Sequence, residues 1–273
     1  MVQWHSQMIP TPTTSLHLWR AGHGAPIVLL HGYTESAECL LAYGATLVDT
    51  HEVIAIDARG HGLSGHPGSG YTNHDNAADV RHVITSLGLV KPILIGHSMG
   101  ARTALAAGGL FPELLRAVVL EDPPLFDWVE PVRGPNDPLP AHTKWLLELK
   151  AMRTEGLIRQ CLIDNPQWQA SEILPWVTAK QQFAMHRVPD TAETLVPWRD
   201  DIAALRVPAL LVLGESAAGG AVEAETAAIC RSVSPMIEVA LLRGASHAVR
   251  RSQPDAFRAL LSEWMRRTYR MHQ

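Results

Sequence analysis

Cysteine is scarce in this chain, which has three cysteines among 273 residues. Cys39, Cys161 and Cys230 are too few and too widely spaced to suggest a disulfide framework or a zinc site. No apolar run approaches the roughly 18 residues that a membrane span requires. The N-terminal segment also lacks the basic stretch and the following apolar stretch of a secretory signal. We therefore expect a reduced, cytoplasmic protein.

An excess of charge of one sign is also lacking. Lys and Arg number 23 against 27 Asp and Glu, which gives a net charge of −4. This balance offers no electrostatic basis for binding nucleic acid or an anionic membrane. Histidine is plentiful, with 14 residues, but none has metal-ligand spacing such as H-E-x-x-H. We expect no metal and no cofactor, and a small-molecule substrate as the partner. Nothing in the sequence indicates an oligomeric state.

Short apolar runs alternate with helical patterns along the chain. This alternation predicts an α/β fold, a mostly parallel sheet with helices on both faces. The expected parallel strands lie at 27–30, 52–57, 93–95, 117–121, 209–213 and 237–241, and runs near 2–8 and 15–20 add an antiparallel edge. The expected helices lie at 37–48, 76–87, 99–110, 223–232 and 254–267.

The alternation stops between residues 125 and 205. Several prolines predict a loop there, and Trp145, Leu149 and Met152 then follow at helical spacing. We predict a helical cap at 125–205, inserted into a core domain made of 1–124 and 206–273.

Tryptophan is concentrated in this predicted cap. Of its tryptophans, Trp128, Trp145 and Trp176 are predicted to line a substrate pocket. The alternative for each is that it packs the insertion onto the core.

The most specific motif is the pentapeptide Gly96-His97-Ser98-Met99-Gly100. A β-branched run precedes it and an Ala- and Leu-rich helical pattern follows it. The order strand, Gly-x-Ser-x-Gly, helix places a serine on a sharp turn with its hydroxyl exposed. The flanking glycines are needed because a Cβ at either position would clash with the neighbouring chain. We therefore predict that Ser98 is a nucleophile.

A second glycine motif, G-x-G-x-x-G at residues 60–65, follows a predicted strand and suggests a dinucleotide site. Such a site requires a helix to open at once, with its N-terminus at the pyrophosphate. Pro67, Gly68 and Gly70 follow instead, so no helix can start there. The context excludes a dinucleotide.

Three further motifs, together with the Ser98 pentapeptide, resemble those of the α/β-hydrolase fold family. His31-Gly32-Tyr33 follows the third strand, residues 57–64 match the pattern D-x-R-G-x-G-x-S, and Gly244-Ala245-Ser246-His247 follows the last strand. The resemblance extends from residue 27 to 264. It implies a mostly parallel eight-stranded sheet with a helical cap after strand 6.

The resemblance also implies roles for individual residues. His247 takes the proton of Ser98 and returns it to the leaving group. The backbone N–H groups of Tyr33 and Met99 form the oxyanion hole, and His31 lies beside them in the substrate pocket.

The acid of the triad departs from the commonest family pattern. Most members have an aspartate three residues past the glycine that ends the seventh strand, where this chain has Ala217. Some branches carry the acid after the sixth strand, and Asp122 stands there in an Asp-Pro step. We predict Asp122 as the acid, with Glu215 and Glu121 as alternatives.

These features predict a metal-free serine hydrolase that cleaves an ester or lactone bond of a small, largely apolar substrate through an acyl-enzyme. Serine at position 98 argues against the dehalogenase and epoxide-hydrolase branches, which need a carboxylate there. The alternatives are a C–C bond hydrolase or an amidohydrolase on the same triad, with a haloperoxidase side activity also open. A slow or non-catalytic small-ligand receptor is an alternative of another class.

Overall fold

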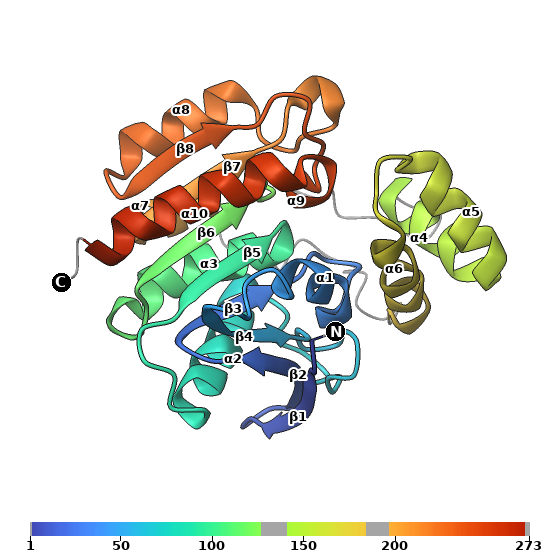
Figure 1. The fold of residues 1–273 in the computed structure, drawn as a ribbon, viewed down its shortest axis with the longest axis horizontal. Helices are drawn as coiled ribbons and strands as arrows, with labels where there is room; N and C mark the ends of the chain where they lie inside the picture. Colours follow the sequence, from blue (N-terminus) through green and yellow to red (C-terminus); the bar gives the residue numbers. More distant parts are fainter. Residues whose placement is uncertain (1, 127–140, 184–196, 271–273) are drawn as a thin grey trace.

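A computed structural model describes residues 2–126, 141–183 and 197–270 of the chain. Eight strands form one sheet in the order β1-β2-β4-β3-β5-β6-β7-β8 (Figure 1). The strands are β1 (His5–Pro10), β2 (Ser15–Gly22), β3 (Ala25–Leu30), β4 (His51–Ile56), β5 (Ile93–His97), β6 (Ala117–Glu121), β7 (Ala209–Leu213) and β8 (Ile237–Leu241). Strands β1 and β2 are antiparallel to their neighbours, and all other pairs are parallel. The predicted α/β-hydrolase sheet is confirmed.

Two apolar cores cover the two faces of the sheet. On one face the strands pack against α2 (Asn73–Ser86), α3 (Met99–Leu110), α7 (Trp198–Ala204) and α8 (Ala224–Val233). On the other face they pack against the 3-10 helix η1 (Ala37–Leu40), α1 (Leu41–Gly44), α9 (Val249–Ser252) and α10 (Pro254–Arg270). The central strands are apolar on both sides because both of their faces are covered. None of the described helices combines the length and the apolarity needed to cross a membrane.

The expected helix at 37–48 is shorter in the structure and is divided into η1 and α1. Past Gly44 the chain turns more tightly than an α-helix, with Thr46 N–H donating to Tyr43 O and Leu47 N–H donating to Gly44 O. The Thr46 hydroxyl donates to the same Tyr43 carbonyl at 2.8 Å. Such local side-chain bonds compete with the regular helical pattern.

Of the described α-helices between β6 and β7 in the sequence, three stand apart from the sheet at the right of Figure 1. They are α4 (Ala141–Ala151), α5 (Thr154–Asp164) and α6 (Ala170–Gln182), and they share a small core of their own. The fourth helix of the predicted cap range, α7, packs on the sheet instead. Its Trp198 and Ile202 belong to the apolar core around α3.

Candidate active site

Ser98 occupies a strained turn between β5 and α3. Its φ is +51° and its ψ is −114°, a conformation that non-glycine residues rarely adopt. A Cβ on Gly96 would lie 2.1 Å from Gly100 O, and one on Gly100 would lie 2.2 Å from Leu30 O. Both glycines are therefore required for the turn, as the sequence motif predicts.

Asp122 follows β6 and His247 follows β8. Their side chains meet at the carboxyl ends of the parallel strands, where the Ser98 turn also lies. Asp122 Oδ2 lies 2.7 Å from His247 Nδ1. The carboxylate also accepts Ala221 N–H at 2.7 Å and Gly214 N–H at 3.2 Å. Because an ionised carboxylate only accepts hydrogen bonds, His247 Nδ1 carries the proton and Nε2 keeps its lone pair. Asp122 is fully buried, whereas the His247 side chain is 39% exposed and so accessible to a substrate.

The two alternative acids are bound elsewhere. Glu215 accepts Gly244 N–H at 2.7 Å and braces the loop that leads to His247. Glu121 is buried and accepts both the backbone N–H of Arg250, at 2.8 Å, and its Nη1, at 2.9 Å. Of the three predicted carboxylates, Asp122 is the one that the described structure joins to His247.

The turn that carries Ser98 lies next to the loop that carries His247. The rings of His97 and His247 are 4.9 Å apart, and His97 Nε2 is 3.2 Å from His247 O. Within the described part of the chain, no hydrogen bond joins the Ser98 hydroxyl to His247. Catalytic hydrogen bonds of this type are often long until substrate binds.

The two predicted oxyanion donors, Tyr33 and Met99, also lie at the carboxyl ends of the strands. Met99 is the first residue of α3, so its N–H has no acceptor within the helix. Tyr33 follows β3, and its carbonyl is bound by His61 Nε2. Its ring packs edge-on against Phe183 of the segment after α6, with ring centres 5.2 Å apart.

His31 lies beside Met99 along the wall of a small cavity, and its ring contacts two neighbouring backbone groups. Its side chain is buried, with Nδ1 2.8 Å from Gly32 O and Nε2 accepting Ala58 N–H at 3.0 Å. Both ring nitrogens are therefore occupied by backbone groups.

The tryptophans predicted to line the pocket have different environments. Trp176 is 7% exposed and packs in the small core of α4, α5 and α6, with Lys180 Nζ 4.6 Å from its ring centre. Trp176 therefore packs among the helices, as in the alternative to a role in the substrate pocket. Trp145 is 40% exposed. Trp128 lies outside the described residues.

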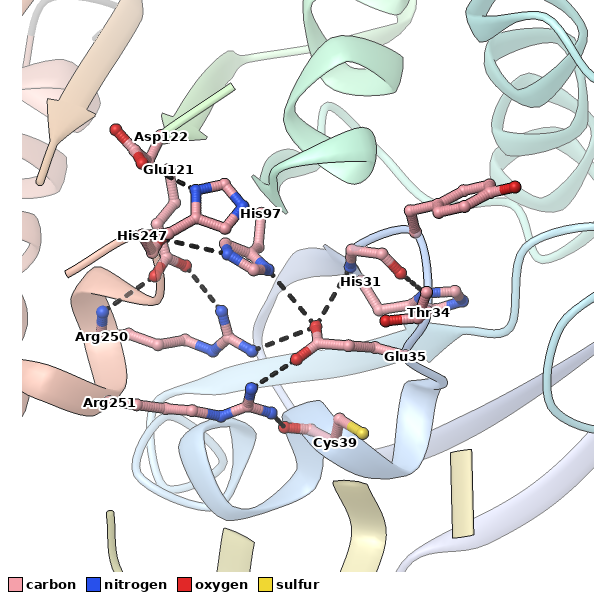
Figure 2. A network of polar contacts seen from close by, with 12 residues as sticks. His31, Thr34, Glu35, Cys39, His97, Glu121, Asp122, His247, Arg250 and Arg251 are labelled. Atoms are coloured by element: carbon pink, nitrogen blue, oxygen red, sulfur yellow. Dashed lines mark hydrogen bonds and ion pairs between the residues drawn. The ribbon is translucent and has the colours of Figure 1, made fainter. Parts of the chain in front are cut away.

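Sequence reasoning missed a buried cluster of charged residues behind His247 (Figure 2). We call it the Glu35 cluster, and it consists of Glu35, His97, Glu121, Glu172, Arg250 and Arg251. Arg251 binds Glu35 through Nη1 and Glu172 through Nε, the latter at 2.7 Å. The signal in the sequence was the position of these charges, since Glu35 follows Tyr33 closely and the two arginines follow His247 closely.

The cluster and one lysine attach the cap to the core. Glu172 and Lys180 both belong to α6. Lys180 Nζ donates to Thr34 O at 2.9 Å and to Thr34 Oγ1 at 2.6 Å. Burial lowers the pKa of Lys180 to about 8. The guanidinium of Arg251 also lies 4.4 Å from the ring centre of Trp168 in the cap.

A second Ser-His-Asp series lies at the far edge of the sheet. Ser6 Oγ is 2.9 Å from His17 Nε2, and His17 Nδ1 is 2.7 Å from Asp57 Oδ2. Asp57 also accepts Ala37 N–H at 2.6 Å. Ser6 stands in the regular strand β1 and not on a turn before a helix. This series ties the D-x-R-G-x-G-x-S loop to the edge strands.

Comparisons with known proteins identify the family of the chain. The profile of the "Alpha/beta hydrolase family" matches residues 27–260. N-formylmaleamate deformylase of Pseudomonas putida is 28% identical over 255 residues, 91% of each chain. The 2-(acetamidomethylene)succinate hydrolase of Mesorhizobium japonicum is 35% identical over 117 residues, which span 43% of this chain and 42% of that relative.

The fold is also found among solved structures. Naproxen esterase (carboxylesterase NP) from Bacillus subtilis superposes with a TM-score of 0.78 at 21% identity, over 97% of this chain and 92% of that one. With the family profile covering most of the sequence, the chain belongs to the alpha/beta hydrolase family.

Proposed function

We propose that this protein is a serine hydrolase that cleaves an ester or lactone bond of a small substrate through an acyl-enzyme on Ser98. The observation that carries the proposal is the 2.7 Å contact between Asp122 and His247 at the sheet edge where Ser98 stands on its strained turn. A histidine held by a buried carboxylate near a partly exposed serine is the arrangement that activates a hydroxyl for attack.

The proposed reaction has two halves. Ser98 Oγ attacks the acyl carbon while His247 Nε2 takes its proton, and Asp122 stabilises the imidazolium that forms. The N–H groups of Met99 and Tyr33 bind the oxyanion of the tetrahedral intermediate. His247 then protonates the leaving alcohol, the acyl group stays on Ser98, and a water activated by His247 releases the acid.

An amide is the second candidate substrate. The relative named N-formylmaleamate deformylase matches over 91% of both chains, and that name denotes removal of a formyl group from nitrogen. The same residues serve this reaction, except that His247 must protonate an amine leaving group. Comparison of matched ester, lactone and N-formyl substrates separates the two candidates, and a preference for the N-formyl compound by kcat/KM favours the amide.

Turnover of p-nitrophenyl acetate and butyrate tests the proposal against the receptor alternative. We expect many turnovers per protein molecule, because water can reach the half-exposed His247 in the acyl-enzyme. One equivalent of p-nitrophenol followed by arrest would contradict a hydrolase and favour a slow receptor. The measurement is the amount of p-nitrophenol released per molecule of protein, followed well beyond the first equivalent.

Two tryptophan variants test which cap residues set substrate preference. Trp176→Ala removes a buried ring and should cost about 3–5 kcal/mol of cap packing, lowering the melting temperature and all activities alike. Trp145→Ala affects a more exposed ring and should change the ratio of kcat/KM for butyrate and acetate esters with little change in melting temperature. An unchanged ratio for Trp145→Ala would remove this residue from the pocket.

A further inference from the structure

The carboxylate of Glu35 contacts its own loop after β3, the last residue of β5, and α9 (Figure 2). Its Oε2 accepts Gly32 N–H at 3.1 Å and lies 3.3 Å from His97 Nδ1. Its Oε1 accepts a hydrogen bond from Arg251 Nη1, and Arg250 Nη2 lies 3.6 Å from Oε2. Glu35 is buried, with 6% of its surface exposed, so water does not compete for these contacts.

Each partner of Glu35 is a close neighbour in sequence of one group of the proposed mechanism. Gly32 precedes Tyr33, and His97 precedes Ser98. The arginines belong to α9, which begins two residues after His247. We infer that Glu35 is a positioning residue that sets the nucleophile, the oxyanion donor and the histidine relative to one another. This inference rests on the proposed function.

Two residues that contact Glu35 also contact or belong to the backbone near His247. His97, whose Nδ1 lies against Glu35, has its Nε2 3.2 Å from the carbonyl oxygen of His247. Arg250, whose guanidinium lies near Glu35, follows His247 in the chain and donates its backbone N–H to Glu121. Burial lowers the pKa of His97, so its ring is neutral near pH 7 and carries one N–H. In either tautomer one of its two contacts is a hydrogen bond.

The neighbours of Glu35 favour its ionised form. Burial alone would raise its pKa, but Arg251, His97 and Arg250 hold the pKa of Glu35 well below its usual range. The charged and titratable groups around Glu35 and His247 are Asp122, Glu121, His97, Arg250, Arg251, Glu172, Lys180 and Cys39.

Glu172 provides a matched control for a purely structural ion pair. It binds the same Arg251 at 2.7 Å and is also buried, but it belongs to the cap helix α6. Among its described contacts none is with the loops of Ser98, Tyr33 or His247. Loss of Glu172 charge therefore weakens the cluster without releasing those three loops.

The test compares Glu35→Gln with Glu172→Gln in the full-length protein, on p-nitrophenyl acetate. Glu35→Gln should lower kcat about 100-fold with KM within about twofold, because small misplacement of reacting groups carries such a cost. Glu172→Gln should keep kcat and KM close to wild type.

Glu35→Asp keeps the charge but shortens the reach of the carboxylate, and it is the second variant should Glu35→Gln fail to fold. It should also lower kcat with little change in KM, because the shorter side chain cannot reach Gly32 N–H, His97 and Arg251 together. Wild-type kcat in either Glu35 variant, or the same losses in Glu172→Gln, would overturn the inference.

A fluorophosphonate separates this inference from the proposed function. Failure of the wild-type protein to react at Ser98 would overturn the function itself. Reaction at Ser98 with equal rates in wild type and Glu35→Gln would overturn only the positioning role.

Discussion

Ser98→Ala should abolish turnover while the protein stays folded. Removal of the nucleophile from a serine triad lowers kcat by about 10⁶. Alanine keeps the Cβ of serine, so the strained backbone at φ +51° costs the variant no more than the wild type. Circular dichroism and the melting temperature should therefore match the wild type, and hydrolysis of p-nitrophenyl acetate should fall to background.

Labelling with a fluorophosphonate adds a positional measurement to the loss of activity. Peptide mapping should find the label on Ser98 alone. The control is Ser6, because it has its own histidine and aspartate partners in His17 and Asp57. Ser6 lies in a strand without the helix N-terminus that follows Ser98, so Ser6→Ala should leave labelling unchanged. Undiminished turnover by Ser98→Ala, or a label on Ser6, would remove the basis of the proposed mechanism.

The strands could be predicted because each one has a local signature. Runs such as Ile27–Leu30 are apolar at every position, as both faces of the sheet are covered. The start of α2 was placed three residues late, at 76 instead of Asn73. Thr72 and Asp75 form a capping box there, a local signal that the sequence did contain. The break after Gly44 had no comparable signal, because it follows from hydrogen bonds within the turn.

The candidate site also has a part that could be predicted from local sequence and a part that could not. The turn around Ser98 could be predicted since strand, glycines and helix are contiguous in the sequence. The Glu35 cluster could not, because Glu35 and Arg251 are 216 residues apart in the chain and only the folded sheet brings them together. The motif places His31 beside the oxyanion donors, whereas its hydrogen bond from Ala58 N–H, in a different loop, could not be predicted from the sequence.

Asp122→Asn should lower kcat by about 10⁴ near neutral pH, the cost of the equivalent change in a serine triad. Asparagine tolerates the φ of +43° at this position, so the backbone should be retained. The carboxylate accepts two backbone N–H groups and His247 Nδ1, whereas an amide offers one oxygen and one NH2 group. With the NH2 group toward His247, Nδ1 must accept, and the proton moves to Nε2, where the base is needed.

The matched control is Glu215→Gln, which concerns the carboxylate that directly follows the seventh strand, near the position where most members of the family have the acid. Glu215 binds Gly244 N–H, and glutamine keeps an oxygen for that bond. Its kcat should stay within a few-fold of wild type, a small change beside that of Asp122→Asn. Steady-state rates on p-nitrophenyl acetate, with melting temperatures for both variants, decide the matter. If Glu215→Gln is inactive and Asp122→Asn is active, the acid follows the seventh strand. If both are active, either Glu121 serves as the acid or His247 works without a carboxylate.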